Sequence, residues 1–179
     1  MAAVTPGDPQ RPDFHPPCPI GPSHDATAFA SGHPSLDDWL RHTALRAEGR
    51  TARTYVVTEG PHAIAGYYCL ATGAVRRAEA PGAVRRNAPD PIPAAIIGRL
   101  AVTRQHQGHG LGGGMLRDAL LRIAQMSQSI GCAAVVVHAI DEQATDFYAR
   151  YGFVAFPAGT RTLFLPIGTV VGAVTASQS

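Results

Sequence analysis

Hydrophobic and polar residues alternate along this chain with spacings that predict helices and strands. Apolar positions recur every three or four residues over 35–48, between a serine that can cap a helix and a glycine that can end one. This spacing predicts an amphipathic helix. Two further helices are expected over 115–128 and 142–151.

Strands are expected where β-branched and aromatic residues gather. The segments 51–59 and 63–71 flank the turn Gly60-Pro61-His62 and predict a hairpin. Three more strands are expected over 95–102, 132–139 and 160–165. Alternating strands and helices in one chain of this length predict a single α/β unit.

The ends of the chain depart from this pattern. Residues 1–19 are crowded with proline, which disfavours a helix and predicts an extended, poorly ordered leader. Residues 168–179 are mostly small and are expected to form a C-terminal tail. The domain is therefore expected over 20–167, and within it residues 73–93, rich in Gly, Pro, Arg and Asn, form a long loop. Long loops in compact domains are often functional.

Composition is consistent with one globular domain. The chain has 179 residues, of which 45% are hydrophobic and 16% charged, enough to bury a sizeable core. Its three cysteines are widely spaced without a CxxC pair, which favours neither a disulfide framework nor a zinc site. No apolar stretch approaches a membrane span, and no signal peptide pattern opens the chain. We expect a cytoplasmic protein with no membrane partner.

The most informative segment is the glycine-rich run from Gln105 to Gly114, placed between an expected strand and an expected helix. Such a turn exposes backbone N–H groups beside the positive end of a helix dipole, which is the environment that a phosphate or pyrophosphate requires. The run therefore predicts a site for a phosphorylated ligand.

Three kinds of phosphate site place glycines in this way. The spacing Gly108-x-Gly110-x-x-Gly113 matches the dinucleotide fingerprint, but that motif needs an acidic residue about 20 positions later. Asp118 falls inside the expected helix and Asp141 lies beyond the next strand, so neither residue is placed as the dinucleotide motif requires. A P-loop is excluded because the run lacks the Gly-Lys-Ser/Thr ending and the chain contains no lysine. The third pattern is Gln-x-x-Gly-x-Gly, which begins at Gln105.

This third pattern resembles the GNAT superfamily of N-acetyltransferases, in which a Gln/Arg-x-x-Gly-x-Gly/Ala turn holds the pyrophosphate of acetyl-CoA. The segment from Phe147 to Phe153 also matches that superfamily's Phe-Tyr-x-x-x-Gly-Phe ending. The resemblance implies a GNAT fold: a mixed, mostly antiparallel β-sheet, flanked by helices and splayed at the acetyl-CoA site.

The resemblance also implies which residues bind acetyl-CoA. The pantetheine arm is expected to pair with the backbone of the strand before the glycine turn, and the turn is expected to receive the pyrophosphate. These residues are Leu100, Ala101, Val102, Gln107, Gly108, His109, Gly110, Leu111, Gly112 and Gly113.

The N-terminal half resembles a narrower group, the GNAT-type toxins of bacterial toxin–antitoxin modules (the TacT and AtaT group). The similarity rests on His24-Asp25, Phe29-Ala30-Ser31-Gly32 and Leu36-Asp37-Asp38-Trp39-Leu40, and it extends over about 20–166. It implies acetylation of the α-amino group of an aminoacyl-tRNA, which inhibits translation. It also implies a ribbon-helix-helix antitoxin as partner and DNA contact only through that antitoxin, whereas a homodimer stays open.

The expected chemistry agrees with an α-amino acceptor. An α-amino group with a pKa near 8 is appreciably neutral at pH 7, whereas a lysine side chain near 10.4 is mostly charged. Many lysine acetyltransferases of the superfamily carry a glutamate base on the strand before the glycine turn, but residues 95–102 contain no carboxylate. Asp141 and Glu142 stay open as alternative bases. Tyr148, at the family's position for the general acid, is expected to protonate the leaving CoA thiolate.

Arginine supplies all 15 of the basic Lys and Arg residues, although the formal net charge is only +2. Arginine suits bidentate phosphate contacts, and Arg46 and Arg50 are spaced for one helix face. The resemblance favours a basic rim for tRNA over a merely solvated surface. The expected contacts are Arg46, Arg50, Arg76, Arg77 and Arg99.

Two histidines in the glycine turn, His106 and His109, lack nearby carboxylate or cysteine partners in the sequence, so no metal site is expected. Two other functions stay open on the sequence alone. One is a small-amine or protein N-terminal acetyltransferase on the same fold, and the other is a non-catalytic regulatory module bound to its antitoxin.

Overall fold

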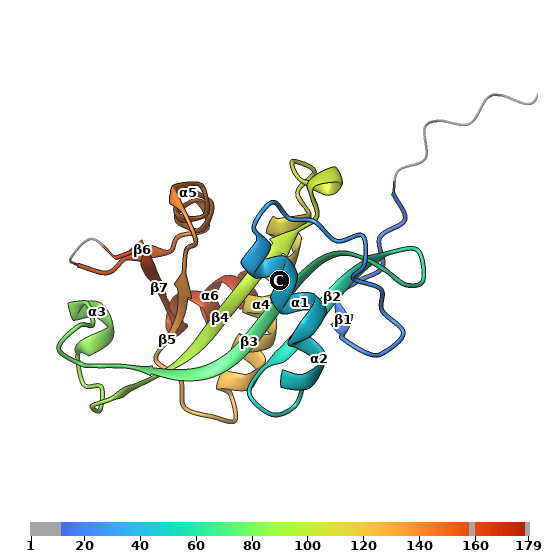
Figure 1. Ribbon diagram of the computed structural model, residues 1–179. Coiled ribbons are helices and arrows are strands. Elements are labelled where there is room, and N and C mark those ends of the chain that lie inside the picture. Colours follow the sequence, from blue (N-terminus) through green and yellow to red (C-terminus); the bar gives the residue numbers. More distant parts are fainter. Residues whose placement is uncertain (1–11, 158–159, 178–179) are drawn as a thin grey trace, which may run out of the picture.

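The computed structural model describes residues 12–157 and 160–177, and its centre is a seven-stranded mixed sheet (Figure 1). The strands lie in the order β1-β2-β3-β4-β5-β7-β6, and only the β4–β5 pair is parallel. Their bounds are β1 Cys18–Pro19, β2 Arg53–Glu59, β3 Ala63–Val75, β4 Ile92–Val102, β5 Ala134–His138, β6 Val154–Ala155 and β7 Thr162–Pro166. The expected mixed, mostly antiparallel sheet is therefore confirmed.

Helices cover both faces of the sheet. Helices α4 (Leu111–Ser127) and α6 (Ile167–Ala176) lie behind it in Figure 1, and α1 (Pro34–His42), α2 (Ala44–Ala47) and α3 (Gly82–Arg85) lie in front. Alternate residues of β5 pack on opposite layers: Val135 and Val137 join the core with α4, whereas Val136 packs with α3. Helix α5 (Glu142–Arg150) follows β5 directly.

Strands β4 and β5 separate after a short parallel pairing. Their paired residues run from Ala94↔Ala134 to Ile97↔Val137, after which β4 continues to Val102 beside β3 alone. A β-bulge marks the separation, because Leu70 pairs with Ile97 and Cys69 with Arg99, which leaves Gly98 without a partner on β3. The splayed sheet expected from the family resemblance is present at this point.

The ends of the chain are more structured than the sequence suggested. Residues 1–11 lie outside the described part, so the disorder expected there stays a prediction. The rest of the proline-rich leader lies on the sheet: the His15 N–H donates to the Thr58 carbonyl (2.9 Å), and β1 pairs with β2. The expected tail forms helix α6 instead, because Val170 packs into the core beside α4. Tertiary burial thus overrides the low helix propensity of its glycines.

The expected helix over 35–48 is divided into two pieces. Helix α1 begins at Pro34, with His33 rather than Ser35 in the N-cap position, and the helical geometry breaks at Thr43 before the single turn of α2. The loop expected over 73–93 is also shorter, because β3 extends to Val75 and β4 begins at Ile92. A one-turn helix, α3, occupies its middle.

Candidate active site

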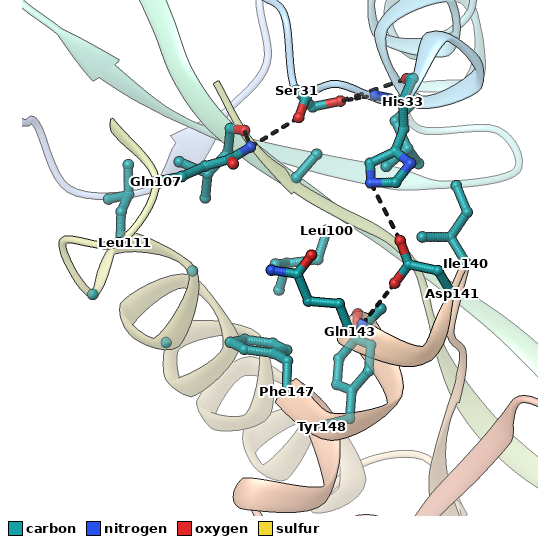
Figure 2. Close-up of a pocket in the computed structure, with 18 of the residues that line it drawn as sticks. Ser31, His33, Leu100, Gln107, Leu111, Ile140, Asp141, Gln143, Phe147 and Tyr148 are labelled. Atoms are coloured by element: carbon teal, nitrogen blue, oxygen red, sulfur yellow. Dashed lines mark hydrogen bonds and ion pairs between the residues drawn. The ribbon is translucent and has the colours of Figure 1, made fainter. Parts of the chain in front are cut away.

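The opening between β4 and β5 contains a cleft of about 670 Å³. Its walls come from the end of β4, the glycine-rich turn, the first turn of α4, helix α5 and the segment before α1 (Figure 2). Segments from both halves of the chain thus meet at the place where the sheet divides.

The glycine turn has a backbone conformation that favours glycine. Gly108 and Gly110 have φ angles of +79° and +82°, a left-handed conformation that costs L-residues with a Cβ about 1–2 kcal/mol. Gly110 is the N-cap of α4, and the first intrahelical N–H to bond back is that of Gly114, which donates to the Gly110 carbonyl. The N–H groups of the first turn are therefore free to bind an anion at the positive end of a 17-residue helix.

Gln107 holds the turn in place. Its side-chain amide donates to the Ser31 carbonyl and to the Val102 carbonyl, both at 2.8 Å. One side chain thereby connects the segment before α1 to the end of β4. These two bonds hold the turn from both sides.

The free edge of β4 faces the cleft through alternate residues. The Thr103 N–H donates to the Ala65 carbonyl at the β3 side. Because backbone groups of successive strand residues point to opposite edges, Ala101 also bonds toward β3, and Leu100 and Val102 face the cleft. The predicted pantetheine contact is thus narrowed to Leu100 and Val102, and the Val102 carbonyl already accepts a bond from Gln107.

The predicted acetyl-CoA residues lie together. All of them line the cleft except His109, whose side chain is exposed. The chain's own residues fit the phosphate and pantetheine of acetyl-CoA. The space around Gly108 and Gly110 is open, the first N–H groups of the helix are free, and one edge of the strand is unpaired.

Tyr148 projects from α5 into the inner end of the cleft (Figure 2). Its side chain is 6% exposed, and burial raises the pKa of its hydroxyl above the ordinary value, with a smaller contribution from Cys69. The hydroxyl therefore keeps its proton throughout the neutral range. Its neighbours Phe147 and Tyr151 also line the cleft, and the Tyr151 hydroxyl lies against Gly113 in the first turn of α4.

A pair of ionisable side chains that no sequence motif indicated lies at the N-terminal end of α5, the helix that carries Tyr148. His33 Nε2 lies 3.6 Å from Asp141 Oδ2, and both side chains are about 40% exposed (40% and 38%). Asp141 is the N-cap of α5, and its other oxygen accepts the Ala144 N–H at 2.8 Å. The histidine carries no local sequence signal, because its partner belongs to the other half of the chain.

The predicted tRNA contacts are distributed over separate places. Arg99 lies on the face opposite α4, with its guanidinium 4.4 Å from the ring centre of Trp39. Arg76 and Arg77 follow β3, next to a second cavity of about 640 Å³ that is lined by Arg85, His138 and Phe156 among others. Arg46 lies on α2, whereas Arg50 lies in the following turn, so the shared helix face expected for these two residues was wrong.

His106 and His109 do not form a site together. His106 is buried, its Nε2 lies 2.8 Å from a Glu59 carboxylate oxygen, and Phe14 packs edge-on against its ring. Within the described residues, no group of three or more His, Cys, Asp or Glu side chains could hold a metal ion. None of the helices described is both long and apolar enough to cross a bilayer.

Comparison with known proteins places these features in a family. Residues 50–155 match the sequence family described as Acetyltransferase (GNAT) domain. The chain is 44% identical over 146 residues, covering 82% of its length and 88% of the relative, to a tRNA-acetylating toxin of Mycobacterium tuberculosis (strain ATCC 25618 / H37Rv). It is 32% identical over 164 residues, covering 85% and 91%, to a probable toxin TacT of Sinorhizobium fredii (strain NBRC 101917 / NGR234).

A solved structure has the same fold. The crystal structure of the KacTA–DNA complex aligns with a TM-score of 0.78 and 25% sequence identity, over 92% of this chain and 99% of the matched chain. The similarity extends over nearly the whole of both chains, including the segments outside the matched family domain.

Proposed function

Because this chain belongs to the GNAT family of acetyltransferases, we propose that it transfers the acetyl group of acetyl-CoA to the α-amino group of an aminoacyl-tRNA. The observation that carries the transfer chemistry is the position of Tyr148. Its largely buried side chain lines the same cleft as the glycine cradle and the free edge of β4. The tRNA acceptor is supported by the 44% identity to a relative named as a tRNA-acetylating toxin.

Binding of acetyl-CoA is assigned to backbone groups. The N–H groups in the first turn of α4 receive the pyrophosphate, and Leu100 and Val102 pair with the pantetheine arm as a further strand would. Gln107 connects the two sets of groups, because its side-chain amide bonds to the end of β4 and to the segment before α1. Acetyl-CoA supplies the activated acetyl group when bound.

Tyr148 acts on the leaving sulfur. The hydroxyl carries its proton at neutral pH, as tyrosine side chains do, and donates its hydrogen to the developing thiolate when the C–S bond breaks. Removing solvent from the donor also strengthens this interaction, because charge is stabilised more by a fixed dipole in a low-dielectric site.

The acceptor approaches from the sheet face covered by α1 and α3. Arg99 and the second cavity both lie on this face, and Arg76, Arg77 and Arg85 border or line that cavity. Arginine side chains there suit the phosphates of a tRNA acceptor end. Arg46 and Arg50 form a second candidate contact near α2.

In the cell, this activity would inhibit translation, so a partner protein would be needed to neutralise the enzyme. The relatives named as toxins support a toxin–antitoxin role, with a ribbon-helix-helix antitoxin as partner and DNA contact only through that antitoxin. A cytoplasmic location follows from a tRNA substrate, and we also propose the homodimer that the sequence left open.

The deciding experiment uses purified protein, radiolabelled acetyl-CoA and charged total tRNA. Label should appear in tRNA and should be released with the amino acid after mild alkaline hydrolysis, which identifies the acetylated residue. Deacylated tRNA should accept none. Labelling of free amines or peptides without any requirement for tRNA would contradict the proposal and favour a small-amine or N-terminal acetyltransferase.

A further inference from the structure

An amine that attacks a thioester must lose a proton, and the proposed function leaves the acceptor of that proton unassigned. Among the described residues that line the cleft, the ionisable side chains are His33, His106, Asp141, Tyr148, Arg150 and Tyr151. Strand β4 contributes no carboxylate to this set. The base must therefore be sought among these six residues.

Four of the six are unsuited to accept a proton at neutral pH. Tyrosine and arginine side chains are already protonated there. His106 is 7% exposed, its Nε2 is bonded to Glu59 at 2.8 Å, and Phe14 covers its ring edge. His33 and Asp141 are left, and they are each other's neighbours.

The geometry of this pair suits proton transfer. The Nε2–Oδ2 distance of 3.6 Å is longer than the roughly 2.7–2.9 Å of a closed charge-assisted hydrogen bond, so the two groups are close without being locked together. Both side chains are partly exposed to the cleft. Figure 2 shows them opposite the glycine turn, above the helix that carries Tyr148.

Asp141 is held in a fixed position on that helix. Its Oδ1 accepts the Ala144 N–H, and the N-terminal end of the α5 dipole favours the charged carboxylate. The carboxylate can therefore orient the His33 ring and stabilise its protonated form, as an aspartate does beside a catalytic histidine. Helix α5 thus carries both Asp141 and Tyr148, whereas His33 comes from the N-cap of α1.

We propose that the His33–Asp141 pair is the proton acceptor of the transfer reaction, an inference that rests on the proposed function. The α-amino nitrogen forms a bond to the thioester carbonyl carbon, and the C–S bond breaks. The proton lost by nitrogen goes to the pair, and the sulfur receives a proton from Tyr148. The products are the N-acetylated aminoacyl-tRNA and CoA thiol, and solvent returns the proton from the pair to Tyr148.

Other charges near the pair come from several elements. Asp37 of α1 accepts hydrogen bonds from the N–H and hydroxyl of Ser31, Arg104 lies beside Gly32, and Arg161 donates to the Ile140 carbonyl. Glu142 follows Asp141 in the chain. Because conservative variants of the pair leave all these charges in place, a changed pH profile of the reaction reports the pair itself.

The test compares His33→Gln, Asp141→Asn and the double variant with wild type. Asparagine retains the N-cap of α5, so Asp141→Asn removes the charge without removing the cap. We expect His33→Gln to lower kcat about 100-fold and Asp141→Asn to lower it less. The double variant should lose no more than His33→Gln alone, because the two residues act as one unit.

Three measurements separate a base from a merely structural pair. The KM for acetyl-CoA and the thermal midpoint should be unchanged, because exposed ion pairs contribute little to stability. The fall of kcat toward low pH should lose one ionisation in His33→Gln, since histidine gains its proton between pH 5 and 8. Imidazole should restore activity to His33→Ala.

A binding experiment without acetyl-CoA provides an independent readout. Addition of aminoacyl-tRNA should perturb the NMR signals of the His33 ring, and those of the exposed His62 in the β2–β3 turn should not move. His62→Gln is the matched control for activity. Unchanged kcat and pH profile in His33→Gln, or a loss confined to KM, would overturn the inference while leaving the proposed function intact. Absence of transfer by the wild-type protein would instead refute the proposed function.

Discussion

The Tyr151 hydroxyl lies against the backbone of Gly113 so closely that a Cβ at position 113 would overlap its oxygen. Both residues line the cleft, Gly113 in the first turn of α4 and Tyr151 at the end of α5. Because Gly113 has no side chain, the Tyr151 ring can lie close to α4, and this contact sets the width of the cleft there.

Gly113→Ala should displace Tyr151 and weaken acetyl-CoA binding, measured by titration calorimetry. Gly114→Ala is the matched control, because nothing lies within 4 Å of its Cβ position and alanine should stabilise the helix by about 0.5–1 kcal/mol. Equal affinities in the two variants would show that the Gly113–Tyr151 contact does not shape the site.

Gly110→Ala should cost about 1–2 kcal/mol of unfolding free energy and reduce acetyl-CoA affinity, because position 110 requires a positive φ at the start of α4. Gly60 has a φ of +62° in the β2–β3 turn, away from the cleft. Gly60→Ala should therefore cost a similar amount of stability and leave the dissociation constant unchanged. Similar reductions of affinity in both variants would contradict a specific role for the cradle.

Tyr148→Phe should retain acetyl-CoA binding and lower the rate of transfer about 100-fold, since only the hydroxyl is removed. Tyr151→Phe is the comparison, because Tyr151 lines the same cleft just after the end of α5, and this variant should keep most of the rate. Single-turnover kinetics at saturating acetyl-CoA measures the chemical step directly. Full turnover by Tyr148→Phe would remove this residue from the mechanism.

Tyr148→Phe should also change the stability of the protein at alkaline pH. Burial raises the folded-state pKa of Tyr148, while the unfolded chain ionises near pH 10. The contribution of Tyr148 to the free energy of unfolding is thus fully present below about pH 10 and is lost as the pH rises toward the folded-state pKa. Urea unfolding at about pH 8 and about pH 11 should show a smaller loss for Tyr148→Phe than for wild type. Tyr67 and Tyr68, whose pKa values burial also raises, add to the loss in both proteins.

The two arginine groups can be distinguished by salt dependence. Replacing Arg76 and Arg77 by alanine should weaken aminoacyl-tRNA binding and reduce the slope of log affinity against log salt concentration by about 1 for each phosphate that is no longer neutralised. The Arg46→Ala/Arg50→Ala variant should have the smaller effect, because these residues do not border the second cavity. If neither double variant changes the slope, the proposed basic rim has no role in binding tRNA.

The sequence was most informative where structure depends on neighbouring residues. The glycine-rich run predicted a turn between a strand and a helix, and the structure confirms the strand, turn and helix in that order. Only the register of β3 and β4 shows that Leu100 and Val102, and not Ala101, are available for the predicted pantetheine contact, and no local sequence pattern specifies this register. The membership of the GNAT family, inferred from two motifs, is confirmed.

Contacts between distant segments were beyond prediction. The His33–Asp141 pair depends on the fold bringing the N-cap of α1 to the N-cap of α5. Helix α6 depends on burial of Val170 beside α4, which its small residues do not signal. Thr43 interrupts the N-terminal helix although the apolar spacing continues through it.

The bulge at Gly98 makes the two paired strands differ in length by one residue. Ten residues of β3, from Gly66 to Val75, lie beside eleven of β4, from Ile92 to Val102. The surplus residue has no side chain, and a Cβ there would press on the Cys69 sulfur at 3.1 Å. The cleft therefore opens where β4 has one residue more than its partner β3, next to the last residues that pair β4 with β5.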